Sequence, residues 1–177
     1  NPANRMVPLK EAIRTAKEKL RLAFYENADV TTIIHEYSNF IYEVLGFAWD
    51  EFKWIENDKS WRKSRISLLA VGGFGRKELL PHSDIDILIL LERDDVHLNK
   101  DNIQSFVALL WDVGLNVGHS VRSLRDCKRE ALSDVTSLTS MTEARVIRGK
   151  SVLLDKLNAL LHPKKLWQKK KFYLAKA

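Results

Sequence analysis

The stretch Gly72-Gly73-Phe74-Gly75-Arg76, followed by Ser83-Asp84-Ile85-Asp86-Ile87-Leu88-Ile89-Leu90, decides how this chain is interpreted. Glycines come first, and two carboxylates then stand one residue apart at the start of an apolar strand. Residues i and i+2 of a strand point to the same side, so Asp84 and Asp86 aim at one point in space. Converging carboxylates repel each other unless a cation joins them, and Mg²⁺ prefers carboxylates together with substrate phosphates. We therefore predict that Asp84 and Asp86 bind Mg²⁺.

The glycines before the strand suit a phosphate-binding turn. Gly72 and Gly73 permit backbone angles closed to other residues, and their N–H groups can approach phosphate oxygens without a Cβ in the way. The Gly-Lys-Ser/Thr ending of a P-loop is absent, and the glycine spacing does not fit the dinucleotide-binding fingerprint. The glycine pair or the carboxylate pair alone is weak evidence, because both occur at ordinary turns and strand ends. Together, in this order and spacing, they favour metal-dependent nucleotide binding.

Two more side chains of this stretch are candidate nucleotide ligands. Arg76 can pair with a phosphate or with Glu78 as a structural clamp, and the sequence favours neither. Ser83 can hydrogen-bond a phosphate or cap the turn before the strand, and the turn is slightly favoured. The predicted nucleotide-binding set is therefore Gly72, Gly73, Arg76 and Ser83.

The rest of the chain predicts helices around a small sheet. Residues 1–64 form a helical segment that includes one long amphipathic helix from Thr31 to Phe52. Residues 65–122 form the core that carries the sheet, and residues 123–177 form a helical extension that we expect to continue past Ala177. The predicted strands are Ile66–Val71, Asp84–Leu91 and Leu115–Val121.

Capping signals predict where the helices begin and end. Pro8 suits a first helical turn, and Arg76–Leu80 reads as one turn after the glycines. Asp101 is the predicted N-cap of a helix that ends at Gly114. The later helices are predicted from Ser123, from Ser133-Asp134 to near Gly149, and from Ser151 to Leu161.

Composition places the chain among globular proteins. Its 177 residues are 45% hydrophobic and 29% charged, and no apolar run approaches the roughly 20 residues that span a bilayer. The single cysteine, Cys127, cannot form an internal disulfide, which fits a reducing compartment. We therefore expect a cytoplasmic protein with no membrane partner. The basic neighbours of Cys127 can lower a thiol pKa, but a cysteine without a special role is favoured.

The formal net charge of +6 suits an anionic partner, which is a nucleotide, a nucleic acid or an acidic protein. The lysines gathered toward the C-terminal end are the feature that favours nucleic acid. Charge runs are usually solvated faces, and no RNA-recognition motif or aromatic-rich basic platform is present in the sequence. A nucleic-acid partner is therefore not expected.

The glycine and aspartate pattern resembles the nucleotidyltransferase superfamily typified by DNA polymerase β. That superfamily carries a Gly-Gly or Gly-Ser pair and then Asp-x-Asp/Glu on a strand. The strings Val71–Asp86, Leu110–Arg122 and Glu143-Ala144-Arg145 resemble one branch, the N-terminal domain of bifunctional PII uridylyltransferase/uridylyl-removing enzymes. The resemblance implies a mixed α/β fold, with a polymerase β-like core whose small mixed sheet is flanked by N-terminal and C-terminal helices.

The resemblance also implies a reaction. Such an enzyme transfers UMP from UTP to a tyrosine of the nitrogen-signalling protein PII and releases pyrophosphate. It implies Mg²⁺ as cofactor, Asp84 and Asp86 as catalytic metal ligands, and UTP and a PII-type protein as partners. A nucleotidyltransferase of other base or acceptor specificity stays open, as does a non-catalytic nucleotide-sensing domain.

One position departs from the superfamily pattern. Members usually add a third carboxylate on a later strand, and the corresponding residue here is Asn116, which is neutral and a poor base. Either another carboxylate serves, or the metal site is weakened. His119 and Arg122 can contact substrate from the same strand, although a satisfied histidine and a surface arginine account for them equally well. The other carboxylates considered are Asp112, Asp134 and Glu143.

Overall fold

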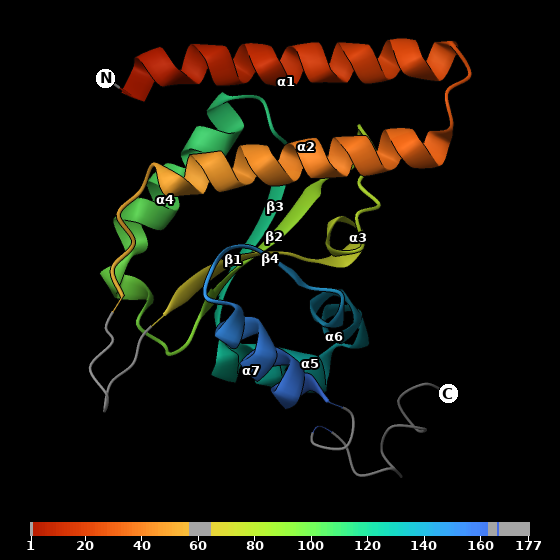
Figure 1. The fold of residues 1–177 in the computed structure, drawn as a ribbon. Helices are drawn as coiled ribbons and strands as arrows, with labels where there is room; N and C mark the ends of the chain where they lie inside the picture. Colours follow the sequence, from red (N-terminus) through yellow and green to blue (C-terminus); the bar gives the residue numbers. More distant parts are fainter. Residues whose placement is uncertain (1, 57–64, 163–165, 167–177) are drawn as a thin grey trace.

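Seven α-helices surround a four-stranded sheet within residues 2–56, 65–162 and 166, the part of the chain that the computed structural model describes (Figure 1). The strands are β1 (Ile66–Ala70), β2 (Ile85–Leu91), β3 (Val117–Ser123) and β4 (Arg145–Gly149). The helices are α1 (Pro2–Tyr25), α2 (Val30–Asp50), α3 (Gly72–Gly75), α4 (Lys100–Asp112), α5 (Leu124–Ser133), α6 (Val135–Thr142) and α7 (Ser151–Leu161), with a 3₁₀ turn η1 (Val96–Leu98). No helix of the described part is long and apolar enough to cross a membrane.

The sheet is small and mixed, as the sequence predicts. Its strand order is β3-β2-β1-β4. β1 runs antiparallel to β2 and β4, whereas β2 and β3 are parallel and joined through α4. A parallel pair needs such a long crossover, because a tight turn cannot return the chain in the same direction. The two central strands are nearly buried throughout, so their apolar runs are explained by cover on both faces.

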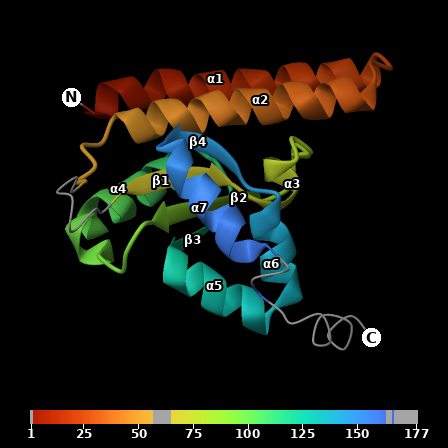
Figure 2. The same cartoon turned by 60° about the horizontal axis from the view of Figure 1, so that its bottom comes forward.

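Helices cover each face of the sheet with a separate hydrophobic cluster (Figure 2). Ile87 and Ile89 of β2 pack with residues of α2 and α4, and Leu88 and Leu90 pack with residues of α5 and α7. This alternation follows from the two-residue period of a strand. α1 lies along the outer side of α2 in both views. The predicted amphipathic helix Thr31–Phe52 is confirmed as α2, whose apolar stripe faces the sheet.

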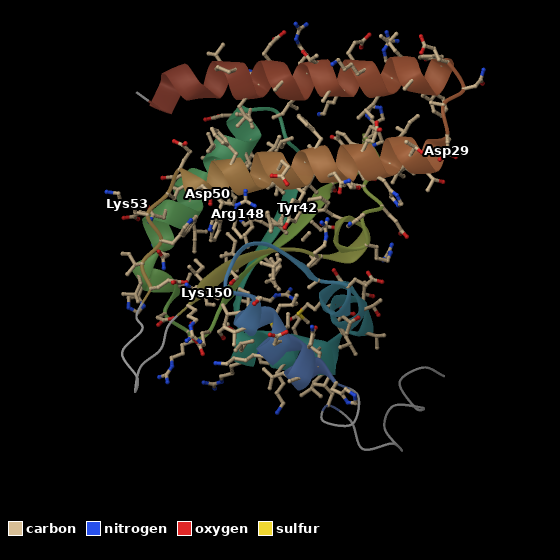
Figure 3. All side chains as sticks on the ribbon, in the orientation of Figure 1. Asp29, Tyr42, Asp50, Lys53, Arg148 and Lys150 are labelled. Carbon is tan, nitrogen blue, oxygen red and sulfur yellow. The ribbon has the colours of Figure 1, made fainter. Side chains whose placement is uncertain are left out.

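Polar contacts fasten α2 to the edge strand β4 (Figure 3). Tyr42 donates a hydrogen bond to the backbone oxygen of Val146 over 2.7 Å, and Arg148 forms an ion pair with Asp50 over 3.0 Å. The guanidinium of Arg148 lies against Gly46, where an added Cβ would come within 2.4 Å of it. The helical segment before the sheet is therefore bound to the last strand of the sheet.

Three predicted helix boundaries are wrong. Pro8 lies inside α1 rather than in its first turn. The single turn that follows β1 is formed by the glycines of α3, with Arg76 as its C-cap, and not by Arg76–Leu80. The N-cap of α4 is Asn99 rather than Asp101, because the helix already begins at Lys100. The side chain of Asn99 does not cap the helix; it bonds both backbone groups of Ile55.

The predicted helix from Ser133-Asp134 toward Gly149 is also wrong beyond Thr142. Asp134 does cap α6, but Arg145–Gly149 is a strand that pairs with β1. The open edge of β1 needs a hydrogen-bonding partner, and that need is not visible in a local pattern. Residues 123–177 therefore include a strand as well as helices, and the three-part division of the chain stays a prediction. Residues 57–64, where a boundary was predicted, and most of the lysine-rich end lie outside the described residues.

Candidate active site

The two predicted metal ligands lie together at one end of the sheet. Asp84 directly precedes β2, and Asp86 is the second residue of that strand. The backbone oxygen of Asp86 accepts a hydrogen bond from the N–H of Val71 over 3.1 Å, which ties it to the start of α3. The antiparallel pairing of β1 and β2 brings the glycine turn after β1 next to the carboxylates before and within β2. The spatial association that the sequence spacing predicts is therefore present.

The electrostatics of the pair suit a cation. Burial and the neighbouring charge of Asp84 raise the pKa of Asp86 above its ordinary value. A cation between the two carboxylates would relieve this unfavourable negative charge, and two carboxylates are a ligand set that Mg²⁺ accepts. The described residues contain no cluster of three or more His, Cys, Asp or Glu side chains suited to a metal.

An amide stands where a third carboxylate was sought. Asn116 donates a hydrogen bond from its side chain to Asp84, and its backbone oxygen accepts one from the N–H of Ile85 over 2.9 Å. Of the other carboxylates considered, Asp134 is occupied in capping α6, and Glu143 forms an ion pair with Arg76. Asn116 is thus the side chain that the fold places beside Asp84.

Two glycines flank the carboxylate of Asp86. Gly72 has a φ of +56°, which favours glycine, and an added Cβ there would lie 3.8 Å from Asp86 Oδ2 and 3.3 Å from Ser140 Oγ. Gly118 pairs with Asp86 across the sheet, and an added Cβ there would lie 2.7 Å from Asp86 Oδ1. Sequence reasoning found Gly72 but missed Gly118. The signal for Gly118 was a glycine within a strand, which often marks a close approach.

Arg76 is held in a structural ion-pair network. Its guanidinium forms ion pairs with Glu78 over 2.7 Å and with Glu143 over 2.5 Å. Of the two roles that the sequence left open, the structural clamp with Glu78 is therefore present. Arg145 contacts the same turn, because its Nη2 is 3.5 Å from the backbone oxygen of Phe74. Its Cζ lies 4.5 Å from the centre of the Tyr42 ring, so the guanidinium is held between α2 and the turn. The Glu143-Ala144-Arg145 string therefore holds the glycine turn in place. Phosphate binding by Arg76 stays a prediction.

Asp86 lines two cavities. The first, which we call the glycine-turn cavity, has a volume of about 400 Å³, and its lining includes Gly73, Ser83 and Asp84. This volume lies within the range of roughly 300–1,000 Å³ that is typical of small-molecule sites. The second, the β3–α6 cavity, has a volume of about 270 Å³. Its polar lining residues are Asp86, His119, Ser120, Arg122, Thr136, Ser137 and Ser140.

Two other features lie apart from the carboxylates. A larger apolar cavity of about 830 Å³ lies between α1, α2 and the turn at Leu80–His82, and neither Asp84 nor Asp86 lines it. Cys127 is buried, and burial raises the pKa of its thiol to about 12. A thiol held neutral is a poor nucleophile, which supports the interpretation of Cys127 as a core residue.

Comparison with known proteins gives a consistent result. Residues 52–131 match a family described as a nucleotidyltransferase domain. The chain is 41% identical over 174 residues to a bifunctional uridylyltransferase/uridylyl-removing enzyme of Pseudomonas savastanoi pv. phaseolicola, an alignment of 98% of this chain and 19% of that protein. It is 40% identical over 167 residues to the enzyme of the same name from Azotobacter vinelandii, covering 94% of this chain and 18% of that protein. The chain thus spans about a fifth of the length of these curated relatives.

Proposed function

We propose, because the chain contains a nucleotidyltransferase domain homologous to that of bifunctional uridylyltransferase/uridylyl-removing enzymes, that it transfers UMP from UTP to a tyrosine of a PII-type signalling protein and releases pyrophosphate. One observation carries the proposal. Asp84 and Asp86 lie beside a glycine turn, both line the glycine-turn cavity, and Asp86 also lines the β3–α6 cavity. Charge develops on the attacking and leaving oxygens during such a transfer, so carboxylates that hold cations belong between the two reacting groups.

Each part of the site has a task in this scheme. Asp84 and Asp86 would hold Mg²⁺, which when bound stabilises negative charge on the phosphoryl oxygens. The backbone N–H groups of Gly72 and Gly73, with the hydroxyl of Ser83, would seat the phosphates. Asn116 orients Asp84 through its hydrogen bond. Because an amide accepts no proton at neutral pH, the proton of the acceptor hydroxyl passes to the carboxylate pair or to water.

The first prediction tests the carboxylate pair. UTP binding is measured by calorimetry with Mg²⁺ and with EDTA, for the wild-type chain and for the double variant Asp84→Asn, Asp86→Asn. We expect Mg²⁺-dependent binding in the wild type and none in the variant, because the amides cannot neutralise a divalent ion. The matched control is Asp94→Asn with Asp155→Asn, which removes two exposed carboxylates elsewhere. Equal UTP binding in all conditions would refute the metal-binding function.

The amide at position 116 favours a second candidate, a domain that binds nucleotide without turning it over. A third carboxylate helps bind the catalytic metal and activate the nucleophile in the superfamily that this chain resembles. A turnover assay with UTP and a PII protein separates the two candidates. Pyrophosphate release with label on the acceptor supports the transferase, and UTP binding without release supports the sensor.

A further inference from the structure

The β3–α6 cavity extends away from the carboxylates along one strand. Asp86 lies opposite Gly118 at its beginning, and Arg122 lies opposite Leu90 farther along the same pair of strands. Four residues of a parallel strand span about 13 Å. If a phosphate binds beside Asp86, a nucleoside attached to it has room to extend along the cavity as far as Arg122.

The lining of this cavity suits a flat ring with polar edges. Val71, Leu88 and Met141 supply apolar surface, and the hydroxyls of Ser120 and Ser140 come from opposite walls. A serine hydroxyl both donates and accepts a hydrogen bond, so it can serve a ribose hydroxyl or the edge of a base. At about 270 Å³ the cavity lies near the lower end of small-molecule sites, which favours a single-ring base over a purine.

Arg122 gives the far end of the cavity a defined chemistry. Its side chain is 26% exposed, with Nη2 3.8 Å from Glu130 and Nη1 3.9 Å from the sulfur of Met141. Both contacts are long, so the guanidinium keeps donors that can reach a ligand. Arginine donates only, and it stays charged at all relevant pH values. A base with a carbonyl oxygen at this position can accept a hydrogen bond from Arg122. A base with an amino group at this position would place two hydrogen-bond donors against each other.

We propose that the β3–α6 cavity is the nucleoside subsite and that Arg122 selects uracil over cytosine by donating to the carbonyl oxygen that cytosine replaces with an amino group. This inference rests on the proposed function and deepens it. The phosphates then lie in the glycine-turn cavity, and the α-phosphate lies at the junction beside Asp86. Ser120 and Ser140 are the hydroxyls that face the ribose and the base between the two ends.

The test separates base recognition from phosphate binding. Equilibrium binding of UTP, CTP and inorganic tripolyphosphate, each with Mg²⁺, is measured for the wild type, Arg122→Gln and Arg122→Lys. Glutamine can donate or accept, so Arg122→Gln should reduce the preference for UTP over CTP by about tenfold or more. Arg122→Lys keeps a donor and should retain most of the preference. Tripolyphosphate affinity should be unchanged in both variants, and Arg129→Gln, on the exposed side of α5, is the matched control.

Each outcome decides the matter. An equal loss of affinity for UTP and tripolyphosphate would make Arg122 a phosphate ligand and overturn the subsite. An unchanged ratio of UTP to CTP affinity in Arg122→Gln would overturn it as well, while leaving the proposed function intact. A wild-type chain that binds none of the three ligands would refute the proposed function and the subsite together. Thermal midpoints of all variants show whether they are folded.

Discussion

Asp86 carries a charge that the metal-free protein accommodates poorly. Its pKa is raised by burial and by Asp84, so the folded protein holds this proton more tightly than the unfolded chain does. The contribution of Asp86 therefore favours folding below the ordinary aspartate pKa of about 3.9 and is lost as the pH rises through the raised value. Near neutral pH the ionised carboxylate of Asp86 therefore opposes folding, and a cation bound beside it would offset this effect.

The variant Asp86→Asn tests whether the ionised Asp86 side chain lowers the stability of the folded protein. Without metal, we expect it to be more stable than the wild type near neutral pH, by less than about 1 kcal/mol because solvent screens a half-exposed pair. The difference in stability between the variant and the wild type should decrease as the pH falls below the pKa of Asp86, because the wild-type side chain is then neutral as well. Thermal denaturation in EDTA across this pH range measures it, with Asp94→Asn as the exposed control. A wild type that is more stable than the variant at neutral pH would contradict the assigned cause.

Asn116 is the residue at which the proposed metal site can be tested. Replacing it by aspartate removes the hydrogen-bond donor to Asp84 and adds a third carboxylate beside the pair. We expect Asn116→Asp to raise Mg²⁺ affinity by about tenfold, or roughly 1.4 kcal/mol. Titration of Mg²⁺ in the presence of UTP measures the change. Asn158→Asp adds the same charge on an exposed face of α7, and an equal effect of both variants would place Asn116 outside the metal site.

At the scale of elements, the pairing of β2 with β3 creates the site. Their parallel register places Gly118 directly opposite Asp86, and Asn116 just before β3 beside Asp84. A shift of one residue would bring a side chain against the carboxylate and turn the apolar face of the strand outward. The glycine at 118 is therefore explained by space for a carboxylate and not by backbone angles, since its φ is not in the left-handed region.

Gly118→Ala tests this register argument. The added Cβ would lie 2.7 Å from Asp86 Oδ1, so the carboxylate must move away from its partner. We expect Mg²⁺-dependent UTP affinity to fall by about tenfold or more, or at least 1.4 kcal/mol, with little change in thermal midpoint. Gly114→Ala is the matched control, because it has open space but a φ of +85°. It should lower stability by about 1 kcal/mol and leave UTP affinity unchanged, and the reverse pattern would contradict the argument.

Helix and strand boundaries show what local patterns can predict. The helices α2 and α7 and the strands β1 and β2 follow their predicted ranges closely, because periodic apolar residues and caps specify them. Ser123 caps α5, as predicted, and the structure adds that Asp126 completes a capping box with it. The bonds of the Asn99 side chain and the strand β4 were missed, because they depend on the backbone of Ile55 and on the open edge of β1. Both partners are distant in sequence.

At the scale of the whole molecule, one sheet separates two hydrophobic clusters. The cluster on one face joins α1, α2 and α4 to the sheet, and the other joins α5, α6 and α7. The end of β2 that carries Asp84 and Asp86 lies at the border between the clusters, beside α3 and α6. Tyr42 of α2 bonds Val146 of β4, and Arg148 of β4 pairs with Asp50 of α2. The strand β4 begins two residues after Glu143, which pairs with Arg76 at the glycine turn. The helices before the sheet thus support the turn through the last strand.

The sequence by itself determined the carboxylate pair, the glycine turn beside it, the mixed α/β class and the likeness to nucleotidyltransferases, because these depend on residue types at short spacing. The tertiary structure decided the remainder of the site. It bound Arg76 to Glu143, placed Gly118 and Asn116 against the two aspartates, and formed the cavity that ends at Arg122. The physical reason is that these contacts join segments far apart in the chain, and only the packing of strands and helices brings such segments within bonding distance.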